Sequence, residues 1–105
     1  MSERLRRYEI LLPLRYNDGR RVPAEFLNQT RTELRDRFGA LSSETQIIRG
    51  DDAETESDGD ELVRVFIDVP DSQENRDFFK ATQERLAKRF EQVEILVTTF
   101  PVERL

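Results

Sequence analysis

Two stretches of the chain carry the same helical spacing of apolar residues, 52 positions apart. In both stretches the apolar positions recur every three or four residues, which gives a helix one buried stripe. The repetition predicts two similar halves, each with a helix between strand-like segments. The repeated residues are Phe26, Leu27, Thr30, Leu34, Arg37 and Phe38 in the first stretch and Phe78, Phe79, Thr82, Leu86, Arg89 and Phe90 in the second.

The ends of both helices are predicted from their capping residues. The first helix is expected to open at Val22-Pro23, because the missing N–H of proline costs nothing in a first turn. Gly39 stands where a left-handed C-cap belongs and ends this helix. The second helix is capped by Asp71 or Ser72 and is expected to run to about Glu91.

Four strand-like segments surround these helices. The first is apolar on both sides and suits an interior strand, the second is polar and suits an edge, and the third alternates most clearly. Proline has no N–H for the pairing ladder, so Pro13 should end or interrupt the first strand, and Pro70 and Pro101 should end the third and fourth. The expected strands are Tyr8–Leu14, Leu41–Arg49, Leu62–Val69 and Val93–Phe100.

The order of these elements predicts the fold class. Strand, helix, strand, strand, helix, strand with right-handed crossovers gives an α+β fold of the ferredoxin-like βαββαβ type. This plait is a four-stranded antiparallel sheet with two helices on one face. A length of 105 residues fits a single domain, residues 1–105, because it is too short for two independent cores. The acidic loop 51–61 would then lie between strands 2 and 3.

Two helices cover only one face of such a sheet, and the other face offers a candidate interface. If Val63 and its alternating neighbours pack on the helices, Leu11, Phe66, Leu96 and Phe100 form an apolar patch on the open face. Exposed patches of more than roughly a few hundred Å² usually mark an interface. We expect a homodimer, since symmetric dimers are the commonest assembly. Scattered surface apolar residues and a small-molecule site are the alternatives.

One segment supplies the acidity of a chain whose net charge is −5. Residues 51–61 hold seven acidic residues and no basic one, which leaves 17 basic and 15 acidic residues elsewhere. Glu54, Glu56 and Asp58 match early positions of a calcium-binding EF-hand loop, but Val65 stands where that loop needs a bidentate Glu. We therefore expect a solvated hairpin loop and no metal site.

Catalytic chemistry has little support in this composition. The chain has no histidine and no cysteine, so the usual base near neutral pH, the strongest nucleophile and any disulfide are absent. Asp68, on the clearest strand, is the one weak candidate for a catalytic carboxylate. Its structural alternative is an ion pair with Arg64 or a neighbouring cation. No cofactor is expected, and whether the protein is an enzyme stays open.

Nucleic-acid binding is disfavoured, although RNA-recognition domains share the predicted topology. Tyr8 and Phe66 could stack on bases, but the third strand lacks the glycine-containing aromatic signature of those domains. The acidic segment would also repel phosphate. The basic residues expected to cluster near one end of the domain are Arg4, Arg6, Arg7, Arg15, Arg20 and Arg21.

The expected location is the cytoplasm. No segment approaches the roughly 20 apolar residues that span a bilayer, so no membrane contact is expected. The charged N-terminal residues lead straight into a strand-like run without a cleavable apolar stretch, which argues against a secretory signal. A small soluble domain of bacterial type accounts for these features.

Four short segments carry a resemblance to a known group: Arg7–Leu14, Tyr16–Gly19, Arg37–Leu41 and Glu74–Phe79. In these segments the chain resembles small uncharacterised bacterial proteins of ferredoxin-like type. The resemblance covers nearly the whole chain except the acidic loop, where Asp51 replaces the aromatic residue expected after Gly50. The shared residues are strand, turn and helix positions, so the resemblance implies a fold and no activity.

The leading hypothesis is a non-enzymatic protein-interaction module that self-associates through its open sheet face or binds another protein. The alternative is a small-molecule-binding or enzymatic domain of the dimeric α/β-barrel kind. A site of that second kind would lie in a cavity between the sheet and the helices.

Overall fold

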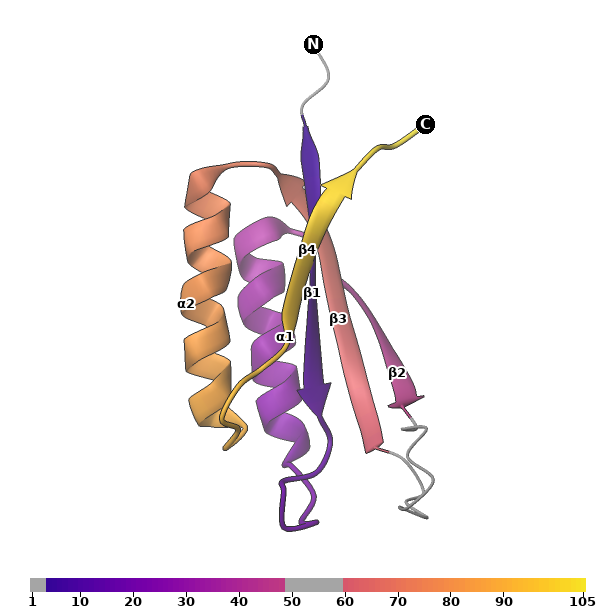
Figure 1. The fold of residues 1–105 in the computed structure, drawn as a ribbon, viewed down its shortest axis with the longest axis vertical. Helices are drawn as coiled ribbons and strands as arrows, with labels where there is room; N and C mark the ends of the chain where they lie inside the picture. Colours follow the sequence, from indigo (N-terminus) through magenta and orange to yellow (C-terminus); the bar gives the residue numbers. More distant parts are fainter. Residues whose placement is uncertain (1–3, 49–59) are drawn as a thin grey trace.

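A computed structural model describes residues 4–48 and 60–105, which form two helices and four strands (Figure 1). The elements follow in the order strand, helix, strand, strand, helix, strand, so the chain is α+β. Their bounds are β1 Leu5–Pro13, α1 Ala24–Phe38, β2 Ser42–Ile48, β3 Asp60–Pro70, α2 Gln73–Arg89 and β4 Val97–Val102.

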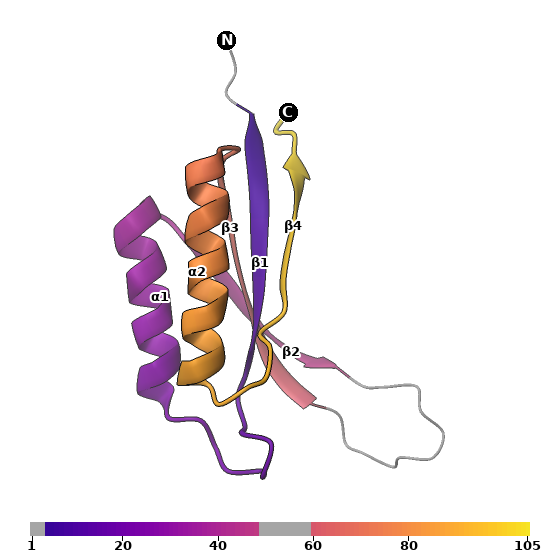
Figure 2. The same ribbon diagram turned by 60° about the vertical axis from the view of Figure 1, so that its left-hand side comes forward.

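The strands form one antiparallel sheet in the order β2-β3-β1-β4. The two central strands, β1 and β3, pair along the whole of β1, from Leu5 opposite Pro70 to Pro13 opposite Leu62. Figure 2 shows both helices on the same side of the sheet. The other side, which the helices leave uncovered, is called the open face below.

The core forms between the helices and the helix-facing side chains of β1 and β3. Side chains alternate along a strand, and Ile10 on β1 lies opposite Val65 on β3, each only 1% exposed. This is the side of the sheet that the sequence pattern assigns to the helices. The buried apolar residues are Tyr8, Ile10, Leu12, Val63, Val65, Ile67 and Val69 from the sheet, with Leu34, Phe79, Leu86, Phe90 and Ile95 from the helices and the segment after α2.

The prediction of a regular four-stranded plait is wrong about the width of the sheet. β2 pairs only with Asp60–Phe66 of β3, and β4 pairs only with Leu5–Ile10 of β1. Because β1 and β3 run antiparallel, these two contacts lie toward opposite ends of the sheet. Among the paired residues that the structure describes, four strands lie side by side only at two rungs, Glu9–Phe66 and Ile10–Val65. Elsewhere the sheet is three strands wide, except at Asp60 and Glu61, where only β2 and β3 pair.

The stagger of the edge strands agrees with the directions in which two prolines face. In an antiparallel ladder the N–H and C=O of one residue point to the same neighbour, and successive residues alternate. The N–H of Leu14 donates to the C=O of Glu61 on the β3 side. The backbone nitrogen and carbonyl of Pro13 therefore point to the β4 side, at a level that β4 does not reach. The backbone nitrogen of Pro70 likewise points to the β2 side of β3, beyond Ser42, the first residue of β2. No ladder needs the N–H that these prolines lack, and both oppose extension of the edge strands.

The fourth strand lies further along the chain than the predicted Val93–Phe100. β4 spans Val97–Val102 and contains Pro101, which the prediction placed as its end. The N–H of Leu11 donates to the C=O of Leu96 at 3.1 Å, so even-numbered residues of this segment face β1. Pro101 therefore faces away from the sheet, where no neighbouring strand needs its N–H. The residues before β4 connect α2 to the sheet edge.

The start of α1 and the end of α2 differ from the prediction by one or two residues, whereas Gly39 caps the end of α1 as predicted. Ser72, rather than Asp71, caps α2, because its hydroxyl accepts a hydrogen bond from the N–H of Asn75 at 3.2 Å. Pro23 occupies the cap position of α1, one residue before the first helical residue. α2 ends at Arg89, two residues before the expected end.

The repeated helix pattern corresponds to a repeated local structure. Thr30 and Thr82 are 0% and 1% exposed, and each hydroxyl donates to the carbonyl four residues earlier at 2.8 Å. The helix ends also correspond, since Gly39 caps α1 with a φ of 82° and Glu91, 52 residues later, has a φ of 53°. Both residues take the left-handed conformation that terminates a helix.

An ion-pair network joins the two helices beside the buried Thr30. Arg89 of α2 donates to the Thr30 hydroxyl at 2.8 Å and to the two carboxylate oxygens of Glu33 at 2.6 and 3.1 Å. The same carboxylate accepts a longer bond from Arg85, at 3.4 Å. Partial burial acts to raise the pKa of Glu33, but the hydrogen bonds and charges of Arg89 and Arg85 outweigh it, so this pKa lies below its ordinary value.

Candidate functional site

The open face carries the four residues that the sequence places in the candidate interface. Phe66 lies on β3, Leu11 lies on β1 beside Leu96, and Phe100 lies on β4. Their exposure differs, because Leu96 is 51% and Phe100 is 42% exposed, whereas Leu11 and Phe66 are half-buried. The exposed apolar surface of this set is therefore concentrated on the β4 side of the open face.

Phe66 lies between two arginine side chains. The guanidinium carbons of Arg7 and Arg64 are 5.1 and 5.0 Å from the centroid of its ring, which is within cation–π distance. Glu9, opposite Phe66 on β1, accepts hydrogen bonds from Arg64 at 3.2 and 3.3 Å. The surroundings of Phe66 are thus charged, whereas the sequence pattern predicted an apolar patch there.

Asp68 is held by Arg7 rather than by Arg64. Arg7 donates two hydrogen bonds to the carboxylate, at 2.7 and 3.1 Å, and Arg104 adds a third at 3.4 Å. Arg64 is four residues away on the same strand, about 13 Å along it. The bonds from Arg7 hold the pKa of Asp68 below its ordinary value. A general base near neutral pH needs a raised pKa, so this geometry gives Asp68 a structural role.

Arg7 and Arg104 are part of this cluster, although the sequence predicted Arg7 only as a member of a basic cluster and gave Arg104 no role. The alternation of β1 could have placed Arg7 on the open face, because Arg7 and Glu9 share one face of the strand. Arg104 has no such signal, since it lies after the end of β4 and reaches Asp68 only in the folded chain.

Replacing Asp68 by asparagine should destabilise the fold by about 1–2 kcal/mol at neutral pH, because Arg7 loses a charged acceptor. Since folding lowers the pKa of Asp68, its carboxylate stabilises the fold above the unfolded-state pKa of about 3.9 and loses this effect as the pH falls through the folded-state pKa. The difference between wild type and variant should therefore shrink below about pH 4. Urea unfolding at several pH values measures it.

The matched control for this experiment is Glu84→Gln, which removes an exposed carboxylate from α2. We expect this variant to change the free energy of unfolding by less than about 0.5 kcal/mol at any pH, as for most surface substitutions. A stability difference between wild type and Asp68→Asn that stays constant from neutral pH to pH 2 would contradict the assigned pairing.

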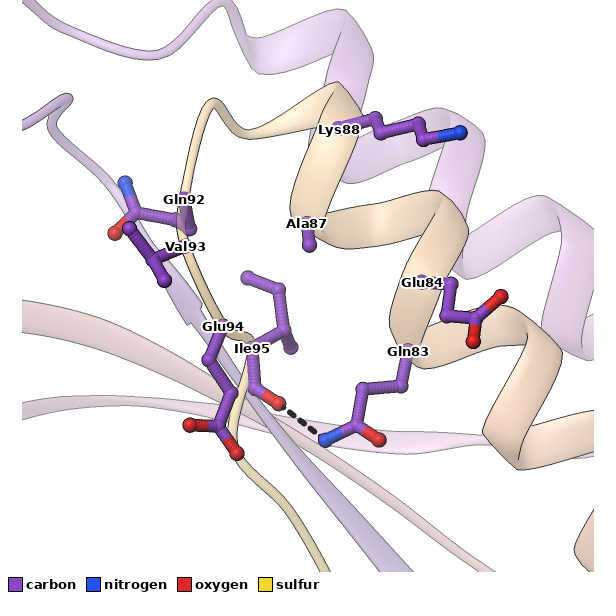
Figure 3. A pocket seen from close by; sticks show the side chains of 8 residues that line it. All are labelled: Gln83, Glu84, Ala87, Lys88, Gln92, Val93, Glu94 and Ile95. Atoms are coloured by element: carbon purple, nitrogen blue, oxygen red, sulfur yellow. Dashed lines mark hydrogen bonds between the residues drawn. The ribbon is translucent and has the colours of Figure 1, made fainter.

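A cleft of about 420 Å³ lies between α2 and the segment that leads to β4 (Figure 3). Ala87 and the buried Ile95 provide apolar lining, and the side-chain amide of Gln83 donates to the carbonyl of Ile95 at 2.7 Å. A small-molecule site needs polar groups that converge on the cavity. Figure 3 shows the side chains of Glu84 and Lys88 extending away from residues 92–95, so the charged groups of this cleft do not converge.

A smaller hollow of about 130 Å³ lies beside the first residues of β2. Its charged lining consists of Arg7, Asp68 and Arg104, which already bond to one another. Because these donors and acceptors are engaged within the chain, the hollow offers a ligand little polar chemistry.

The six arginines expected to cluster at one end of the domain lie at two ends of β1. Three of them precede or begin this nine-residue strand and three follow it, so the two groups are about 30 Å apart. The first group is Arg4, Arg6 and Arg7, and the second is Arg15, Arg20 and Arg21. Tyr8, a candidate for base stacking, is 3% exposed and stacks on Phe79, so it is not accessible to nucleic acid.

Neither a metal site nor a membrane span is found in residues 4–48 and 60–105. No group of acidic, histidine or cysteine side chains in these ranges is placed to hold a metal ion, and no helix there is long and apolar enough to cross a membrane. The EF-hand-like residues Glu54, Glu56 and Asp58 lie outside the described residues. The chain matches no protein-family model, no curated protein and no solved structure.

Proposed function

We propose that the protein is a non-enzymatic interaction module that self-associates through its open sheet face. The observation that carries this proposal is the exposure of Leu96 and Phe100 on the sheet face that neither helix covers. Removing apolar surface from water contributes about 25 cal/mol per Å². A second copy is favoured as the partner because a two-fold axis brings the same surface of each copy together.

The charged residues of the open face support a non-enzymatic role. Asp68 and Glu9 each accept two hydrogen bonds from one arginine, so both carboxylates are engaged within the sheet. These pairs also fix the two guanidinium groups beside Phe66. Because arginines hold both carboxylates, neither is free to act as a general base toward a substrate.

Light scattering over a dilution series tests self-association directly. We expect twice the chain mass of 12.4 kDa at high micromolar concentration and a fall toward the monomer mass on dilution, because mass action favours dissociation. A monomer at high micromolar concentration contradicts the proposal.

Replacing Leu96 by aspartate should weaken self-association by about tenfold or more, because the new carboxylate must lose water in the contact. The control is Ala81→Asp, which places the same charge at an exposed position of α2 on the helix side of the sheet. Both variants are first checked for folding by circular dichroism. Equal dissociation constants for folded Leu96→Asp and Ala81→Asp would exclude the open face as the contact surface.

A further inference from the structure

β4 is an edge strand, and within residues 4–48 and 60–105 no other strand lies beside its outer backbone groups. Leu96 accepts a hydrogen bond from Leu11, and the alternation of a ladder then directs the N–H and C=O of Val97 and Thr99 away from β1. Pro101 has the same direction but presents only its carbonyl. The outer edge of β4 therefore offers two donors and three acceptors to another strand.

The outer edge of β4 has little of the protection that edge strands usually have, since Pro101 is its only protective residue. Charged side chains commonly prevent a sheet edge from pairing with another chain, but β4, with the sequence VTTFPV, contains none, although 37% of the chain is charged. The most exposed large apolar residues of the described ranges also lie within β4 or beside its ends. They are Val93, Leu96, Phe100 and Leu105.

We propose that two copies of the chain join by antiparallel pairing of their β4 strands. This inference rests on the self-association proposed above and places the contact at the β4 edge of the open face, where the exposed Leu96 and Phe100 lie. With the two-fold axis at Thr99, the two Thr99 residues exchange N–H···O bonds, and Val97 donates to the carbonyl of Pro101 of the second copy. The proline thus takes a position in which only its acceptor is used.

The same register brings the exposed apolar residues of the two copies together. On the open face, Leu96 lies opposite Val102 of the second copy, and Thr98 lies opposite Phe100 of the second copy. Val93 and Leu105 stand beyond opposite ends of β4, so antiparallel pairing places Val93 of one copy toward Leu105 of the other. The open faces of both copies then form one continuous surface.

The charge distribution also favours this edge. The acidic residues Asp60 and Glu61 begin β3, where β2 pairs with it, whereas β4 is at the opposite edge of the sheet. Pairing at β4 gives the combined order β2-β3-β1-β4-β4-β1-β3-β2 and keeps the β2 strands of the two copies at its two ends. It also leaves the Arg7–Asp68 and Arg64–Glu9 pairs of the open face in contact with water, which avoids the cost of burying them.

Amide hydrogen exchange of the unmodified protein tests the edge pairing. Samples are labelled at a high concentration and at a dilution where light scattering shows monomer, then quenched and read by NMR. We expect the amides of Val97 and Thr99 to exchange at least about tenfold more slowly in the concentrated sample, because only pairing with a second copy protects them. The amides of Thr98 and Phe100 are internal controls, since they face β1 in both states.

The outcomes separate this inference from the proposed function. A dimer in which the exchange of Val97 and Thr99 does not change with concentration overturns the edge pairing and leaves self-association by stacking of the open faces. A monomer at every concentration overturns both. Slower exchange of Val97 and Thr99, with unchanged exchange of Thr98 and Phe100, supports the edge pairing.

Discussion

Replacing Phe79 by alanine is expected to lower the free energy of unfolding by about 3–5 kcal/mol, the usual cost of truncating a buried aromatic residue. The Phe79 side chain is 2% exposed, and its ring stacks on Tyr8 with a centroid distance of 4.0 Å. A second stacked contact, with Phe38 at 5.5 Å, connects α2 to the end of α1. Urea unfolding measures the loss.

The matched control is Phe100→Ala, which removes the same side chain from an exposed position. Phe100 is 42% exposed on the open face, so its truncation in dilute protein should cost less than about 1 kcal/mol. Domains of this size are stable by only about 5–15 kcal/mol. The Phe79→Ala substitution should therefore remove a large part of the total stability. Similar costs for the two variants would contradict the assigned core.

Replacing Glu33 by glutamine is expected to cost about 2–3 kcal/mol, because Arg89 loses its charged partner in a partly buried site. The Arg89 side chain is 11% exposed, so water replaces the lost carboxylate poorly. One hydrogen bond to the Thr30 hydroxyl would remain. Urea unfolding at neutral pH, where Glu33 is ionised, is the appropriate measurement, since its pKa lies below the ordinary value.

A second pair between the helices provides the control for this prediction. Arg37 and Glu74 are 3.2 Å apart, but their side chains are 41% and 81% exposed. Exposed ion pairs contribute about 0–1 kcal/mol, so Glu74→Gln should cost less than about 1 kcal/mol. Equal losses from Glu33→Gln and Glu74→Gln would show that Arg89 is as well hydrated as Arg37.

Much of the secondary structure could be predicted because it depends on nearby residues. The helical spacing that includes Thr30 and Thr82 correctly indicated two helices, and Gly39 correctly marked the end of the first. The predicted end of the fourth strand was wrong, because the effect of a proline depends on the side to which its nitrogen points. Pro101 is tolerated inside β4 only because its nitrogen points away from β1.

The sequence predicted the sheet face on which the candidate residues lie, but not the contacts that they make there. Alternation correctly placed Phe66 and Asp68 on the side of β3 away from the helices. The two arginines beside Phe66 could not be assigned, because the position of Arg7 opposite Asp68 depends on the register between β1 and β3. A shift by one residue would have placed Arg7 on the other face.

Local sequence pattern by itself determined the two amphipathic helices and the buried faces of β1 and β3, because such patterns involve residues only two to four positions apart. Only the tertiary structure decided the staggered sheet edges and the pairing of Asp68 with Arg7, which is 61 residues away in the chain. Contacts of that kind depend on strand register, and register is set by the packing of the whole core and by the turns.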